Sequence, residues 1–242
     1  EGFGFTRGTF TTILTRPRMS SLGSNSGWGW NHPTRDLYNE FEPGDTRREA
    51  AIGVPDAAGL AEAEVTYLGS PYYNNKTSMS EGGAFPSLDH HSRGPLNYRL
   101  MRASDALLLY AEAALESGKD LNAAKWALEE VRARARANAD DPATALPAFP
   151  AYRGYTDTPE SLRDALRHER RVELAMEGHR WFDLVRWGIA ASVMNKDNGT
   201  YGSNESDEVR AEMANFIEGK HELFPIPSEE IALNPMEQNP GY

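Results

Sequence analysis

The stretch LRDALRHERRVELAMEGHRWFDLVRWG, from Leu162 to Gly188, decides how this chain folds. Thr158 and Pro159 come just before it, and these residue types are typical of a helix N-cap and of the first helical turn. Apolar residues then recur near helical spacing, which predicts one apolar face. We expect a long helix, a turn at Gly178 and a second helix with the apolar residues Trp181, Phe182, Leu184, Val185 and Trp187.

Carboxylates stand beside the apolar face of the first predicted helix. Glu169, Glu173 and Glu177 follow one another at steps of four residues. A buried carboxylate is costly unless it is paired, and arginine suits burial because its planar fork binds a carboxylate at two points. The stretch contains the arginines that we expect as partners: Arg163, Arg167, Arg170, Arg171, Arg180 and Arg186. We therefore predict structural ion pairs, and we assign to them Glu169, Arg170, Glu173, Glu177, Arg180 and Asp183.

The same carboxylates permit an enzymatic interpretation, which we do not favour. Glycoside hydrolases use two carboxyl groups at a defined separation, and Glu169 with Glu173, or Glu177 with Asp183, are the candidate pairs. An arginine partner keeps a carboxylate ionised and therefore unsuited to act as a general acid. The sequence also lacks the zinc-protease, nucleophile-elbow, phosphate-loop and dinucleotide patterns. We predict no catalytic residue, no cofactor and no metal, and we interpret His90-His91 as loop histidines.

A helical region precedes this stretch. From Asn97 onward, apolar and small residues recur on one face as far as Gly118, which ends the first helix. A second helix is expected to begin near Asp120 or Asn122. The two helices form an αα-hairpin similar to a tetratricopeptide unit, which cannot bury its apolar face alone. We expect the hairpin to pack on the helix at 159–187 or on helices outside this chain.

Composition and charge limit the classes of protein. With 242 residues, the chain is long enough for one large domain with a core or for two small domains. Its formal net charge of −11 argues against nucleic acid as a partner, because phosphate binding needs a basic face. There is no cysteine, which excludes disulfides and thiolate metal sites. No apolar run reaches the roughly 18 residues that a membrane span needs.

Residues 1–96 are predicted to be rich in loops, with short strands within residues 1–32 and at Glu64–Tyr67. Aromatic side chains occur here among polar residues. Sugar rings stack on Trp and Tyr, while Asn, Asp, Arg and His bind the hydroxyl groups. The candidate ligand-binding residues are Trp28, Trp30, Asn31, His32, Tyr72, Tyr73 and Asn74. The alternative is that these rings only fix the loops to the body, while Trp126, Trp181 and Trp187 are expected in the core or an interface.

Three stretches resemble the SusD/RagB family. ERRVELAMEGHRWFDLVRWG at 169–188 resembles the family hallmark near the C-terminus, and YRLMRASDALLLYAEAALESG at 98–118 resembles a family helix. LFPIPSEEIALNPMEQNPGY at 223–242 resembles the family's C-terminal ending. With a further match at 33–52, the resemblance covers residues 33–242.

The resemblance implies a mainly α fold of the SusD type, with a tetratricopeptide-type hairpin, long loops and a few short strands, as part of a larger all-α domain. Residues 1–242 are then expected to be the C-terminal part of a single domain. Residues 1–96 would form its loop-rich ligand face, and 97–242 its helical body and C-terminal tail. A half carrying a lipidated cysteine is expected to precede them.

Members of this family are non-catalytic, and a lipid anchors them to the extracellular face of the bacterial outer membrane. They capture oligosaccharides or polysaccharides and cap a SusC-type TonB-dependent transporter. The resemblance therefore implies a glycan ligand, this transporter as a partner, and a membrane contact only through a lipid anchor outside this chain. It supplies no binding motif, so the candidate binding residues rest on their chemistry alone. The alternatives are a RagB-like peptide-binding lipoprotein, a helical-repeat scaffold without a small ligand, and a glycosidase.

Overall fold

The computed structural model describes residues 14–15, 27–54, 72–77, 98–149, 151 and 153–242. Most of the region 1–32, the strand expected at Glu64–Tyr67 and the pair His90-His91 lie outside these residues. The chain divides into two compact units, 1–178 and 179–242. Our description of residues 1–242 as the C-terminal part of one domain stays a prediction.

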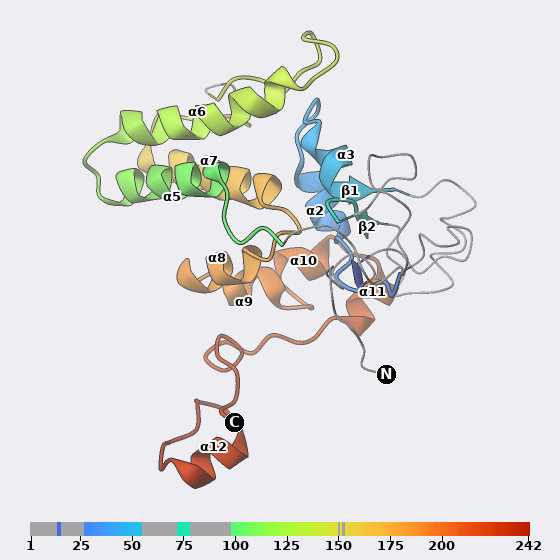
Figure 1. Ribbon diagram of the computed structural model, residues 1–242, viewed down its shortest axis with the longest axis vertical. Coiled ribbons are helices and arrows are strands. Elements are labelled where there is room, and N and C mark those ends of the chain that lie inside the picture. The colour runs from blue at the N-terminus through green and yellow to red at the C-terminus, as the bar shows by residue number, and fades with distance from the viewer. Residues whose placement is uncertain (1–13, 16–26, 55–71, 78–97, 150, 152) are drawn as a thin grey trace, which may run out of the picture. The chain divides into compact units, whose positions relative to one another are not determined.

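The described part of the chain is mainly helical, as predicted (Figure 1). The first unit contains α2 (Arg35–Glu40), α3 (Arg47–Ala51), β1 (Ile52–Gly53), β2 (Tyr73–Asn74), α5 (Ala103–Glu116), α6 (Leu121–Ala137) and α7 (Pro159–Glu173). The second unit contains α8 (Arg180–Arg186), α9 (Ala190–Met194), α10 (Thr200–Ser203), α11 (Asp207–Glu212) and α12 (Ser228–Leu233). Among the described helices, none is both long and apolar enough to span a membrane.

Helices α5 and α6 form the predicted αα-hairpin and pack against α7 (Figure 1). Gly118 follows α5 with a φ of +65°, a conformation that favours glycine. Asp120 caps α6, because its side chain accepts a hydrogen bond from the backbone N–H of Ala123. The core of the three helices consists of Leu108, Ala111, Leu115, Ala124, Ala127, Leu128, Val131, Phe149, Leu162, Ala165 and Leu166. Of the two packing surfaces that we expected for the hairpin, the one on α7 is confirmed, while its tetratricopeptide type stays a prediction.

Helix α7 begins and ends where its sequence predicts. Thr158 accepts a hydrogen bond from the backbone N–H of Ser161, and Pro159 occupies the first turn. The helix ends at Glu173, and the following turn contains Met176 and Gly178 with φ values of +63° and +85°. The turn predicted at Gly178 and the second helix after it, α8, are therefore both present.

A second apolar cluster packs β1 against the C-terminal end of α7, and β2 pairs with β1. The strands are antiparallel, with Ile52 opposite Asn74 and Gly53 opposite Tyr73. A Cβ at position 53 would collide with the ring of Tyr73, so glycine is required there. The buried residues of this cluster are Phe41, Ala51, Ile52, Val172 and Ala175. The cluster thereby places Asn74 near the turn that follows α7.

The second unit has a small core of its own, formed by Leu184, Ala190, Val193 and Phe216, with Trp181 packed against it. Helix α11 ends at Glu212, because Met213 is extended, with a ψ of 136°.

Leucines 108 and 109 on α5 test the core of the first unit, since Leu108 is fully buried and Leu109 is 39% exposed. We expect Leu108→Ala to lower the free energy of unfolding by about 2–5 kcal/mol, because it removes buried contacts and leaves a cavity. Leu109→Ala should cost about 1 kcal/mol or less. Urea denaturation followed by circular dichroism measures both, and equal losses would contradict this description of the hairpin.

Candidate functional site

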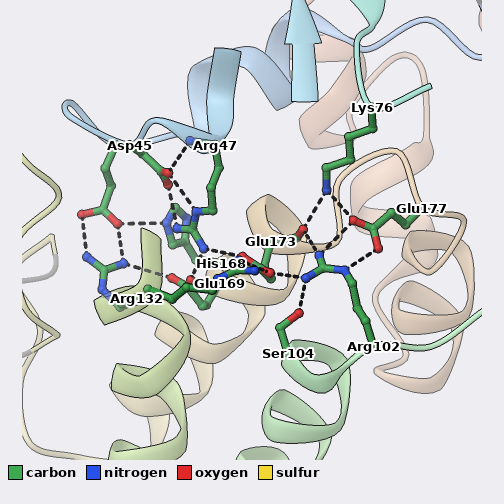
Figure 2. Close-up of polar contacts among 12 residues, drawn as sticks. Asp45, Arg47, Lys76, Arg102, Ser104, Arg132, His168, Glu169, Glu173 and Glu177 are labelled. Atoms are coloured by element: carbon green, nitrogen blue, oxygen red, sulfur yellow. Dashed lines mark hydrogen bonds and ion pairs between the residues drawn. The ribbon is translucent and has the colours of Figure 1, made fainter. Parts of the chain in front are cut away.

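A buried network of charged side chains joins α7 to other segments of the first unit (Figure 2). Glu169 and Glu173 are 0% and 2% exposed. Arg47, at the start of α3, forms ion pairs with both, at 2.9 Å from Glu173 Oε2. Arg132 of α6 lies 3.1 Å from the second oxygen of Glu169. Arg102, which directly precedes α5, also pairs with Glu173. The carboxylates of α7 thus bind three segments at once.

The partners of these carboxylates differ from those that we expected. We predicted arginines of the stretch 162–188, whereas Arg47, Arg102 and Arg132 lie outside it. Carboxylates four residues apart project from the same face of a helix, and here that face meets neighbouring elements. The arginines of the stretch bind other segments instead: Arg163 binds Glu116, Arg170 binds Asp105 and Arg171 binds Asp36.

The two ion-pair candidates of the second unit have different environments. Asp183 is buried and binds Arg186 at 2.8 Å, three residues further along α8. Arg180 was expected to bind a carboxylate. Instead its Nε donates to the hydroxyl of Tyr201 at 2.8 Å, and its guanidinium lies over the ring of Trp187, with no ion pair to a described residue.

Burial and pairing act in opposite directions on the pKa of two buried carboxylates, Glu42 and Glu173. Burial disfavours the charged form of Glu173, but the hydrogen bond and charge of Arg102 and the charge of Arg47 outweigh it and lower the pKa to about 2. Burial is likewise outweighed at Glu42, where bonds from His168 and Arg132 lower the pKa to about 2. These carboxylates are therefore ionised at neutral pH, which is the wrong state for a general acid.

The network ends at a cavity of about 130 Å³. Thr15 and Asn31 form part of the wall, together with Asn74 at the end of β2 and Lys76 and Thr77 just after it. The rest comes from Tyr98 and Arg99 in the loop before α5 and from the turn 176–178. Lys76 connects the cavity to the network: its Nζ donates to the backbone carbonyl of Glu173 at 2.9 Å and to Glu177 Oε1 at 2.5 Å (Figure 2). Glu177 Oε2 accepts a hydrogen bond from Arg102 Nε at 2.7 Å.

Two of the candidate ligand residues, Asn31 and Asn74, line this cavity. Asn74 is 1% exposed, and its Oδ1 accepts the backbone N–H of Lys76 at 3.0 Å. Trp28 and Trp30 lie in the segment that ends at Asn31, and they are 46% and 58% exposed. Both tryptophans therefore offer surface to a ligand.

The other candidate rings contact the protein. Tyr72 stacks on Tyr38 with ring centroids 4.6 Å apart, and Tyr73 packs against Gly53. His32 is half-buried, and burial lowers its pKa. These contacts fit the alternative in which such rings fix the loops, and binding of a ligand by these residues stays a prediction.

Lys76, Tyr98 and Arg99 line the cavity but were not among the ligand-binding residues predicted from the sequence. We expected the helix to begin near Asn97, but α5 begins at Ala103. Arg102 is the N-cap residue of α5, its backbone is extended, and its side chain pairs with Glu173. Tyr98 and Arg99 consequently lie in a loop, where the criterion of aromatic and polar neighbours would have selected them. No group of three or more potential metal ligands occurs in the part of the chain that the structure describes.

Substitution of Glu173 tests the network. Glu173→Ala should lower the free energy of unfolding by about 3–5 kcal/mol, because Arg47 and Arg102 would lose a buried partner. Glu116→Ala is the matched control: its pair with Arg163 is exposed and should contribute less than about 1 kcal/mol. Thermal and urea denaturation measure the two losses. A thermal shift near zero for Glu173→Ala would show that this carboxylate is solvated.

The stability of the protein should also depend on acid. The pKa values of Glu42 and Glu173 fall from 4.5 in the unfolded chain to about 2 in the folded protein. Their contribution is therefore present above a pH of about 4.5 and is lost as the pH falls toward about 2. We expect the urea midpoint to decrease across this interval and Glu173→Gln to show a shallower decrease. A midpoint with the same acid dependence in both proteins would contradict the role of Glu173.

Residues 36–242 match the sequence model of the SusD family. SusD-like protein P38 of Formosa agariphila is 36% identical over 169 residues, which cover 70% of this chain and 29% of that protein. A solved structure described as a laminarin binding SusD-like protein is 30% identical with a TM-score of 0.64, covering 97% of this chain and 44% of that one. Surface glycan-binding protein A from Bacteroides thetaiotaomicron is 25% identical with a TM-score of 0.69, covering 97% and 47%. The chain thus spans less than half the length of each of these three proteins.

Proposed function

Because this chain belongs to the SusD family, we propose that its protein captures carbohydrate at the bacterial cell surface. Two similar proteins support the proposal, since one is described as laminarin binding and the other as a surface glycan-binding protein. Within this chain, the observation that carries the proposal is a pair of exposed tryptophans, Trp28 and Trp30, that directly precede the cavity residue Asn31. Indole rings stack on sugar rings, and the neighbouring amide can bind hydroxyl groups.

The backbone of the cavity also supports a ligand site. Among the described residues, Asn31, Arg153 and Met176 are the non-glycine residues with positive φ. Asn31 and Met176 both line the cavity. Sparsely populated backbone conformations persist only where the surrounding structure holds them, and they concentrate at ligand sites. The cavity is therefore the part of the described chain that we assign to the ligand.

Binding in this proposal is non-catalytic. The carboxylates that a glycosidase would need are held by arginines, and Glu173 has a lowered pKa. The bound glycan passes to a SusC-type TonB-dependent transporter, and a lipid holds the protein on the extracellular face of the outer membrane. Family membership is the support for both of these steps.

The exposure of Trp28 and Trp30 distinguishes glycan capture from a scaffold without a small ligand. A scaffold without a small ligand should bury its loop aromatics, whereas Trp28 and Trp30 are about half exposed, at 46% and 58%. Peptide capture of the RagB kind would favour groups that bind a peptide backbone over rings that stack on sugars. The glycan interpretation therefore has the better support.

Replacement of both loop tryptophans tests the proposal. In isothermal titration calorimetry of the full-length protein against a panel of polysaccharides, we expect one to bind. Trp28→Ala/Trp30→Ala should weaken this binding by at least about tenfold, which corresponds to about 1.4 kcal/mol, because the stacking surface is gone. Trp126→Ala is the control, since Trp126 is similarly exposed, at 54%, but lies on α6.

The panel separates three results. Loss of binding in the loop variant alone supports both the function and the site. Binding that survives the double substitution would remove the tryptophans from the site. Binding to peptides and to none of the polysaccharides would contradict carbohydrate capture.

A further inference from the structure

The polar wall of the cavity is rich in hydrogen-bond donors. The amide oxygen of Asn74 accepts the backbone N–H of Lys76, while its amide nitrogen makes no hydrogen bond to a described residue. Lys76 has three N–H donors, and Glu173 and Glu177 accept two of them. Arg99 is exposed and lines the cavity without an ion pair to any described residue. Asn74, Lys76 and Arg99 therefore have N–H groups left for a ligand.

The carboxylate of Glu177 and the hydroxyl groups of Thr15 and Thr77 already take part in hydrogen bonds within the protein. Glu177 Oε1 accepts from Lys76 and from Arg102 Nη2, and Oε2 accepts from Arg102 Nε. The hydroxyl oxygens of Thr15 and Thr77 lie 2.5 Å apart and form a hydrogen bond with each other. The amide of Asn31 can act as a donor or as an acceptor. A ligand group that accepts hydrogen bonds is thus better matched to this wall than one that donates them.

The charges of the wall favour an anion. Lys76 is paired with Glu177, but this carboxylate also binds Arg102. Arg99 adds a positive charge without a described partner. Burial lowers the pKa of Lys76 even though Glu177 opposes the change, so a second anion in contact with Lys76 would stabilise its charged form. A carboxylate or a sulfate group accepts hydrogen bonds and also carries negative charge, so either would match this wall.

The size of the cavity limits what it can hold. A volume of about 130 Å³ is below the roughly 300–1,000 Å³ of pockets that enclose a whole small ligand. It suits one substituent of a sugar ring. Tyr98 lines the cavity and is 58% exposed. Its ring is therefore available to stack on the sugar that carries the substituent.

We infer that this cavity binds the anionic substituent of an acidic sugar residue, a uronic acid carboxylate or a sulfate ester, with Arg99, Lys76 and Asn74 as the donors. The inference rests on the proposed carbohydrate capture and names the substrate class of that site as an acidic polysaccharide. Charge-assisted hydrogen bonds are roughly twice as strong as neutral ones. The cavity would thereby distinguish acidic from neutral glycans.

The net charge of −11 does not oppose this binding at close range. Exposed charges more than about 8 Å away are largely screened at physiological ionic strength, whereas the three donors contact the substituent directly. The overall charge should slow the approach of a polyanion, because long-range fields mainly affect association rates.

Calorimetry of the full-length protein with oligosaccharides of equal length tests the inference. The probes are an oligogalacturonate, a sulfated galactan oligosaccharide and neutral laminarihexaose, so that the two acidic arms separate carboxylate from sulfate. We expect one acidic probe to bind at least about tenfold more tightly than laminarihexaose. Arg99→Gln should weaken that binding by about tenfold and leave laminarihexaose unchanged. Arg35→Gln, an exposed arginine of α2, is the matched control and should change neither.

Each other outcome has a defined meaning. Laminarihexaose binding as tightly as both acidic probes would overturn the inference and leave carbohydrate capture intact. An acidic probe that binds Arg99→Gln as well as it binds the unmodified protein would overturn the assignment of the cavity. Failure of all three probes, with binding of hexaglutamate instead, would overturn the inference and the proposed function together.

Discussion

Glu169 and Glu173 carry negative charge in the interior of the first unit, and a buried charge persists only where ion pairs and hydrogen bonds replace water. Arg47, Arg102 and Arg132 supply these bonds from three different segments. Side chains from all three segments compensate the charges of α7 in the folded protein. The network therefore specifies which segments meet, and replacement of such a network by apolar residues is often neutral or stabilising in other proteins.

The same network builds one wall of the cavity. Arg102 binds Glu173 and Glu177 at once, and Lys76 binds the backbone carbonyl of Glu173 and the carboxylate of Glu177. The turn after α7 is thus attached to β2 and to the loop before α5. Structural ion pairing and ligand binding are consequently parts of one arrangement, in which Glu177 belongs to both.

Much of the fold could be predicted from the sequence, because residues that cap, end or pair helices act locally. Thr158 and Pro159 predicted the start of α7, Gly118 the end of the hairpin's first helix, and the spacing of Glu169 and Glu173 their need for arginine partners. Which arginines pair with Glu169 and Glu173 could not be predicted, because these arginines lie 37 to 126 residues away along the chain. The cavity was hidden for the same reason: its wall gathers short segments that no periodicity connects. Asn31 and Asn74 were selected for their chemistry, whereas Tyr98 and Arg99 were missed because the helix was expected to begin before Ala103.

The anchoring of Lys76 has a consequence for the thermodynamics of ligand binding. A free lysine side chain loses rotamer entropy when a ligand immobilises it, a loss of about 0.5–1.5 kcal/mol for each such side chain. Lys76 is already held at its Nζ by the carbonyl of Glu173 and the carboxylate of Glu177, so folding has ordered it in advance. Binding at this wall should therefore need little induced fit, with the entropic penalty confined to the exposed Arg99 and to the glycan itself.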